Sequence, residues 1–95
     1  MDLSFDGTVW HWRGPAPWYF VTVPAELSEA LSSNAAHVSY GWGVLPVTAR
    51  IGRTTWRTSL IPKDGRFLVP LKVSVRNAEG IDLDDVVSVH LHVAT

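Results

Sequence analysis

The 95-residue sequence contains no cysteine. This absence excludes disulfide bridges and thiolate metal sites, so the fold must be stabilised by packing, as is usual in the reducing cytoplasm. Charged residues are also scarce, at 18% against 46% hydrophobic residues, which excludes an intrinsically disordered chain. We therefore expect a cytoplasmic protein with a packed apolar core.

Long hydrophobic runs are missing as well. No apolar stretch approaches the roughly 20 residues of a membrane-spanning helix, and the first residues lack the basic and apolar regions of a signal peptide. We therefore expect no membrane partner. The length suffices for one core and not for two, which predicts a single domain over residues 1–95.

Apolar residues often recur at every second position, the pattern of half-buried strands. Gly7 precedes a switch of the apolar residues from odd to even positions, which predicts a bulge in the first strand. The turn Pro62-Lys-Asp-Gly65 separates two strands. The predicted strands span residues 3–13, 18–23, 40–51, 53–61, 67–70 and 87–93.

Two segments have helical spacing instead. The first begins at Pro24 and fades near Asn34, and the second runs from Leu71 to a terminating Gly80. Strands precede and follow each helix. The pattern predicts a mainly β fold, a small closed or nearly closed barrel of about six strands with two short helices, because closure removes exposed sheet edges. A helix-capped open sheet is the alternative.

Several segments together resemble a bacterial family of small barrels, the domain of unknown function DUF1905. They are Trp18-Tyr-Phe-Val, Gly41-Trp-Gly, Thr58-Ser-Leu-Ile-Pro-Lys-Asp-Gly65 and Lys72 to Gly80, and the resemblance covers nearly the whole chain. It implies a double-split β-barrel, the group that includes the DNA-binding AbrB-type transition regulators and MazE-type antitoxins. The resemblance implies a fold more than a function, because one barrel can host unrelated tasks.

The segment from Gly80 to Val89 is similar to the Gly-Ile/Leu-x-x-Gly-Asp-x-Val pattern of those barrels. Asp84 stands where glycine is usual. Aspartate tolerates a left-handed backbone better than most residues, so we expect the turn to be retained.

Charge is distributed unevenly along the chain, although the net charge is only -1. Residues 50–76 contain seven of the eight basic residues and one acid, Asp64, so this segment carries +6 and the remainder -7. Such asymmetry can create a local positive field that attracts anions. Alternatively, these basic residues only form the solvent-exposed faces of a strand and a helix and bind no ligand.

Five tryptophans are many for this length, and they are large enough to dominate either a core or a binding site. Trp18 and Trp56 lie in apolar strands, which predicts core positions. Gly41 and Gly43 leave one strand face bare, at a barrel corner or where a ligand approaches closely. Combined with the basic segment, these features make the candidate ligand-binding residues Trp42, Trp56, Ser59, Lys63, Lys72 and Arg76.

Catalytic and metal-binding signatures are weak. His90 and His92 should leave the same strand face, but a metal needs further ligands that only the fold could bring, so we interpret them as solvated histidines. Ser59 has Lys63 nearby but lacks the spacing of known nucleophiles, and neither a phosphate-binding nor a dinucleotide-binding glycine motif is present. We therefore expect no metal, no cofactor and no catalytic residues.

These features predict a non-catalytic binding domain whose basic face takes an anionic ligand or a protein partner. The alternative is a nucleic-acid-binding or regulatory barrel, by analogy with the AbrB-type relatives. A small hydrolase-type enzyme ranks third, and the oligomeric state is left open.

Overall fold

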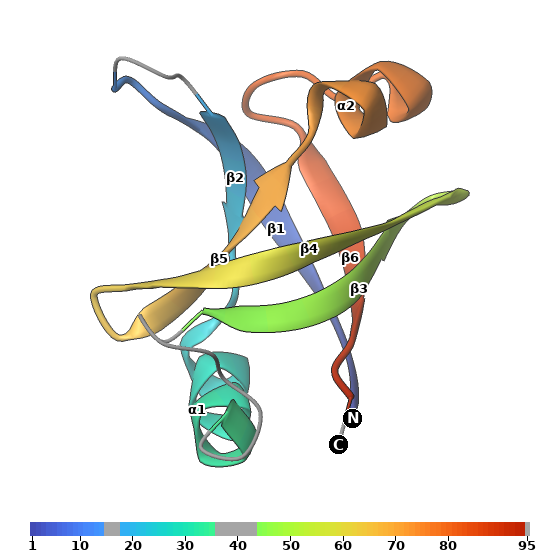
Figure 1. Cartoon of the computed structure of the whole chain (residues 1–95). Coiled ribbons are helices and arrows are strands. Elements are labelled where there is room, and N and C mark those ends of the chain that lie inside the picture. Colours follow the sequence, from blue (N-terminus) through green and yellow to red (C-terminus); the bar gives the residue numbers. More distant parts are fainter. Residues whose placement is uncertain (15–17, 36–43, 95) are drawn as a thin grey trace.

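The computed structural model describes residues 1–14, 18–35 and 44–94. Within these ranges the strands close into one antiparallel barrel in the order β1-β2-β5-β4-β3-β6 (Figure 1). The predicted mainly β barrel is confirmed, and the open sheet is wrong. The strands are β1 (Asp2–Trp12), β2 (Trp18–Thr22), β3 (Leu45–Ile51), β4 (Thr54–Lys63), β5 (Arg66–Leu71) and β6 (Val86–His92), and the helices are α1 (Ala25–Ala35) and α2 (Val73–Glu79).

Two long strands close the barrel by dividing their length between two neighbours. β1 pairs with β6 along residues 2–8 and with β2 along residues 9–12. β4 pairs with β3 along residues 54–60 and with β5 along residues 61–63. This is the split arrangement that the family resemblance implies.

The bulge predicted at Gly7 is wrong, because the register between β1 and β6 runs unbroken through it, with Gly7 opposite Val87. The glycine is needed for space, since a Cβ added there would collide with the Val21 side chain. The strand predicted over residues 40–51 begins later, at Leu45, and the part containing Gly41, Trp42 and Gly43 lies outside the described residues.

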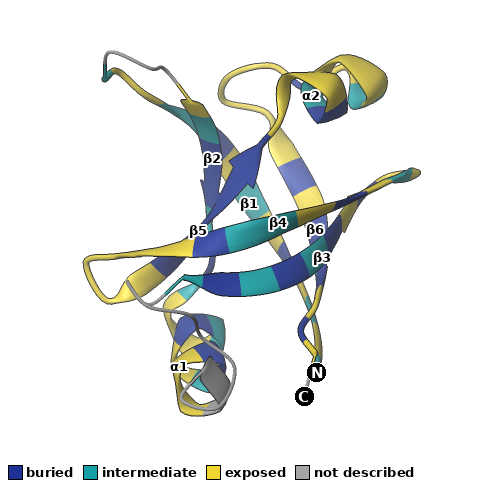
Figure 2. Cartoon of the chain, viewed as in Figure 1, coloured by how far each residue is buried: buried dark blue, intermediate teal, exposed yellow. Residues whose placement is uncertain are grey.

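Alternate side chains of every strand fill the barrel interior. In β6 and just beyond it, Val87, Val89, Leu91 and Val93 are all buried, as their alternation predicts, and the residues between them face outward (Figure 2). Burying one such aliphatic side chain contributes about 1.5–3 kcal/mol. This interior, with no charged residue among the buried ones that the structure describes, is the stabilising core.

The helices cover opposite ends of the barrel (Figure 1). α1 packs Leu31 into the core, and α2 packs Val75. The predicted start of α2 at Leu71 is wrong, because Leu71 is the last buried residue of β5 and Lys72 has the extended backbone of a helix cap. Gly80 ends α2 in the left-handed conformation, as predicted. No helix in the described ranges is long and apolar enough to cross a membrane.

Two aspartates adopt the left-handed backbone conformation. Asp64 (φ 51°) and Gly65 (φ 79°) form the two-residue turn between Lys63 and Arg66, as expected for an Asp-Gly hairpin. Asp84 has φ 69°, so it does occupy the conformation of the glycine it replaces. Its backbone N–H donates to the Val9 carbonyl at 2.9 Å, which ties this turn to β1.

Ser28 is the one buried polar residue in the described part of the chain, and it joins α1 to the barrel. Its Oγ donates to the Val23 carbonyl at 3.1 Å and accepts from the Phe67 N–H at 3.2 Å. We expect Ser28→Ala to lower the free energy of unfolding by about 1–3 kcal/mol, because it leaves a buried donor and a buried acceptor unpaired. Ser33→Ala is the matched control, since Ser33 is exposed and bonds only within α1. Urea denaturation measures both, and equal losses would contradict this role.

The energetic cost of the left-handed backbone conformation at Asp84 can be measured by substitution. We expect Asp84→Ala to destabilise the fold by about 1 kcal/mol, because a Cβ without a local polar partner is disfavoured at positive φ. Asp84→Gly should be at least as stable as the native chain. Asp82→Ala removes the same charge in the same loop, where φ is not positive, and should leave the melting temperature nearly unchanged. A glycine variant less stable than the alanine variant would refute the assignment.

Candidate functional site

The outside of the barrel has two contrasting faces. Barrel strands usually alternate interior apolar residues with polar exterior ones. The outer faces of the first half of β1, of β3 beyond Pro46 and of β6 beyond Val86 follow this rule. The outer faces of β2, β5, the end of β1 and the end of β4 do not, because they carry apolar side chains, among them Trp12 (44% exposed), Trp18 (45%) and Ile61 (38%).

Two adjoining hollows lie on this apolar outer face, and we refer to them together as the outer-face groove. The larger has a volume of about 360 Å³, and both are walled by Trp18, Phe20 and Ile61. The larger hollow is completed by Val44, Thr58, Ser59, Pro70 and Lys72, and the smaller by Trp12, Pro62, Lys63 and Leu68.

Strand register explains why these residues meet. Trp12 of β1 pairs directly with Trp18 of β2, and Phe20 of β2 pairs with Pro70 of β5. Residues opposite each other in a ladder project from the same face, so the tryptophans lie side by side and Phe20 lies beside the proline. Trp10 pairs with Phe20 and lies beside it on the same outer face, with the two ring centroids 5.3 Å apart. The apolar surface is therefore built on paired strands rather than on loops.

Both ends of the groove carry an ammonium group. Lys63 lies over the Trp12 ring, with Nζ 4.3 Å from the ring centroid, and Lys72 borders the larger hollow. Among the described residues that line the groove there is no acidic side chain. The charged side chains that line the described groove are therefore both positive.

The groove unites three of the six candidate residues. Ser59, Lys63 and Lys72 all line it. Trp42 lies outside the described residues. Trp56 is 8% exposed and belongs to the core, as its strand pattern predicts, so it does not reach the groove. The core position predicted for Trp18 is wrong, because Trp18 faces outward.

Arg76 also lies away from the groove. Its guanidinium stacks over the Tyr19 ring at 3.8 Å, and its Nε is buried without a hydrogen-bond partner. The cations of residues 50–76 therefore do not share one face: Lys63 and Lys72 border the groove, Arg76 covers Tyr19, and Arg50 lies on the polar face. The basic residues that are close together in the sequence therefore do not form one cluster in the structure.

Sequence reasoning missed Trp18, Phe20, Ile61 and Pro70 as site residues. A usable signal was present in the run from Trp18 to Val23, which is apolar at both odd and even positions. In the structure, Tyr19 and Val21 of this run point into the barrel. The side chains at the even positions, such as Trp18 and Phe20, therefore project outward. A strand that is apolar at both odd and even positions therefore predicts an apolar patch on the outside of the barrel.

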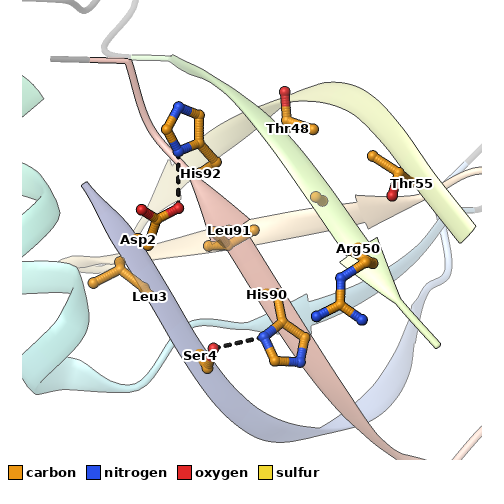
Figure 3. Close-up of a pocket in the computed structure, with 10 residues that line it drawn as sticks. Asp2, Leu3, Ser4, Thr48, Arg50, Thr55, His90, Leu91 and His92 are labelled. Atoms are coloured by element: carbon orange, nitrogen blue, oxygen red, sulfur yellow. Dashed lines mark hydrogen bonds and ion pairs between the residues drawn. The ribbon is translucent and has the colours of Figure 1, made fainter. Parts of the chain in front are cut away.

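The polar face carries the two histidines, on one side of β6 as predicted (Figure 3). His90 Nδ1 lies 2.7 Å from Ser4 Oγ, and His92 Nδ1 lies 2.8 Å from Asp2 Oδ1. Each histidine is thus bonded to the β1 residue directly opposite it. In the described part of the chain no three histidine or acidic side chains lie close enough to hold a metal ion.

The fold and the site together define a small closed β-barrel with a two-faced exterior. The sequence profile of the domain of unknown function DUF1905 matches residues 5–91, nearly the whole chain. The protein therefore belongs to the DUF1905 family. No curated protein matches the sequence.

The pKa of the Asp2 carboxyl lies below its ordinary value of 3.8, mainly because it accepts a hydrogen bond from His92, whose charge adds to the effect. A lowered pKa means that the ionised form is favoured in the folded state, so this contribution to stability is present above pH 3.8 and is lost as the pH falls through the lowered value. We expect NMR titration to place the Asp2 midpoint below 3.8 in the native protein and nearer to it in His92→Ala.

The control for this titration is Ser88→Ala. It removes the neighbouring cross-strand bond from Ser88 Oγ to Asp6 Oδ1 without touching Asp2. The Asp2 midpoint should not move in this variant. An Asp2 midpoint that is the same with and without the His92 imidazole would show that the histidine is not the cause of the lowered pKa.

Proposed function

We propose that this barrel is a non-catalytic, cytoplasmic binding domain, and that its outer-face groove takes a small organic anion with a flat apolar body. The observation that carries the proposal is the pairing of an exposed apolar floor with lysines at both ends and no described acidic residue between them. Ligand sites are mostly apolar hollows with a few polar groups that orient the ligand.

The floor supports an apolar body. Trp18, Ile61 and Pro70 present contiguous hydrophobic surface on rigid strands, and a flat ring can stack against an indole at little conformational cost. Apolar patches exposed on soluble proteins commonly mark interaction sites, because leaving them in water is unfavourable. Covering this floor is a favourable step that a ligand would supply.

The rim supports a negative charge. Lys63 and Lys72 are flexible enough to reach a carboxylate, sulfonate or phosphate on a bound ring, and the Ser59 hydroxyl can donate a hydrogen bond. Among the described lining residues Ser59 has no histidine or carboxylate beside it to act as a base, which a nucleophilic serine would need. The chemistry of the groove therefore favours binding over reaction.

A single-stranded nucleic acid is the competing occupant. The neighbouring indoles of Trp12 and Trp18 could stack bases, and Lys63 could contact a phosphate. Two cations at the ends of a short groove offer little to a long polyanion, whose binding grows with the number of phosphates neutralised. We therefore favour the small anion and make the nucleic acid an outcome of the test.

The probe is 8-anilino-1-naphthalenesulfonate, a flat apolar anion that fluoresces in apolar surroundings, with the uncharged N-phenyl-1-naphthylamine beside it. We expect the native protein to bind the anion more tightly than the neutral compound. Lys63→Ala combined with Lys72→Ala should remove that preference, since each exposed charge contact contributes up to about 1 kcal/mol. Ile61→Glu should abolish binding of the anion. Arg57→Ala, a cation on β4 that does not line the groove, is the matched control.

Equal losses in Arg57→Ala and in the double lysine variant would contradict the proposal. So would the absence of binding by a protein whose melting transition shows it to be folded. Salt-sensitive binding of a short oligothymidylate that the lysine variant loses, without binding of the anion, would instead establish the nucleic-acid alternative.

A further inference from the structure

The polar outer face carries two rows of side chains that each cross four strands, β1, β6, β3 and β4. Strand register defines them, because each residue lies opposite the next one on the neighbouring strand. We call them the serine row, which is Ser4, His90, Arg50 and Thr55, and the aspartate row, which is Asp2, His92, Thr48 and Arg57.

A hollow of about 290 Å³ lies over these rows. It is lined by all four members of the serine row and by Asp2, His92 and Thr48 of the aspartate row, whereas Arg57 lies outside it. Figure 3 shows the guanidinium of Arg50 and the imidazole of His90 beside one another on adjacent strands, with Ser4 on the far side of the imidazole. The hollow therefore holds a guanidinium, an imidazole and hydroxyl groups within one surface.

Arg50 is held in place for anion binding. One terminal nitrogen donates to the Gly52 carbonyl at 3.0 Å, which fixes the side chain over β3. The guanidinium has five N–H groups, so most of them stay available in a planar arrangement that matches the oxygens of a sulfate or phosphate. A single anchored arginine on a strand is better organised for this purpose than a flexible lysine.

His90 can add a charge and two donors at once. In the neutral ring, Nδ1 can accept the hydrogen bond from the Ser4 hydroxyl. When the ring is protonated, Nδ1–H must donate to Ser4 Oγ, which reverses the bond and frees the serine hydroxyl to donate outward. Protonation thus gives the hollow a positive charge, an Nε2–H donor and a hydroxyl donor.

The other charged groups at the hollow oppose or balance this effect. The Asp2 carboxylate is negative and is bonded to His92 at 2.8 Å, so part of its charge is offset when His92 is protonated. Arg57 lies at the outer end of the aspartate row. Because the Asp2 carboxylate repels an anion, a variant that lacks this charge should bind an anion more tightly.

We propose that the serine row is a second binding site, for a tetrahedral oxoanion of the sulfate or phosphate type, and that it binds more tightly when His90 is protonated. The proposal is independent of the outer-face groove, because none of the described residues lines both surfaces. The oxoanion can be free or can belong to a phosphate monoester, and the two sources share the same recognition chemistry.

The test follows the imidazole and backbone NMR signals of the full chain during titration with sulfate, whose charge is constant over the relevant pH range. We expect saturable shifts at Ser4, His90 and Arg50, with tighter binding at about pH 5.5 than at about pH 8, since histidine changes charge between these values. Arg50→Ala should weaken binding about tenfold, the usual effect of losing a charged hydrogen bond. Arg57→Ala, with the same charge change outside the hollow, should weaken it far less.

Two further variants test the protonation step. His90→Gln keeps a side-chain donor but cannot gain a proton, so its sulfate binding should depend less on pH than that of the native chain, with the remaining dependence due to His92 at the same hollow. Asp2→Asn should bind sulfate more tightly than the native chain.

Parallel titrations with inorganic phosphate and phenyl phosphate distinguish the two sources of the oxoanion. Tighter binding of the ester would indicate a phosphorylated ligand, and equal binding would indicate a free anion.

Several outcomes would overturn the site. They are shifts that do not saturate, equal weakening by Arg50→Ala and Arg57→Ala, or a pH dependence in His90→Gln as large as that of the native chain. Failure of sulfate binding would leave binding of the naphthalenesulfonate at the groove unaffected, so the two proposals are tested separately.

Discussion

The seam between β1 and β6 is the constraint on which the rest of this structure depends. It pairs residues from the two ends of the chain, with Asp2 opposite His92 and Thr8 opposite Val86. The closure is extended by reciprocal backbone bonds of 2.8 Å between Met1 and Val93. Because side chains alternate between faces, a slip of one residue would turn Phe5 outward and bring Ser4 into the core. The register of the seam therefore determines both the interior and the polar face at once.

The apolar face follows from a different constraint, which is the shape of the barrel around β2. This strand must supply Tyr19 and Val21 to the interior, yet it also carries Trp18 and Phe20 on its other face. Partial cover comes from within the chain, since Trp10 packs on Phe20 and donates from Nε1 to Thr22 Oγ1 at 2.9 Å. Trp18 keeps nearly half of its surface in water. Packing within the barrel does not account for that exposure, and the ligand proposed for the groove would cover it.

Local chemistry made part of this structure predictable from sequence. The alternation in β6, the Asp64-Gly65 turn and the left-handed Asp84 each depend on residues within a few positions of one another. The errors have a common origin in long-range pairing. Period two indicates which residues share a face but not which face is interior, so Trp18 was placed in the core. The serine row joins residues 86 positions apart, Ser4 and His90, and no local pattern could reveal it.

β4 connects the two proposed sites, because it is long enough to take part in both faces. Thr55 near its start belongs to the serine row, and Ile61 and Lys63 near its end line the groove. Between them Trp56 and Leu60 point into the core, which holds the strand rigidly in register. Sites on a paired and packed strand are positioned more precisely than sites on loops. The ligand proposed for the groove is an anion with an apolar body, the ligand proposed for the serine row is a compact oxoanion, and one rigid strand holds both surfaces in fixed relation.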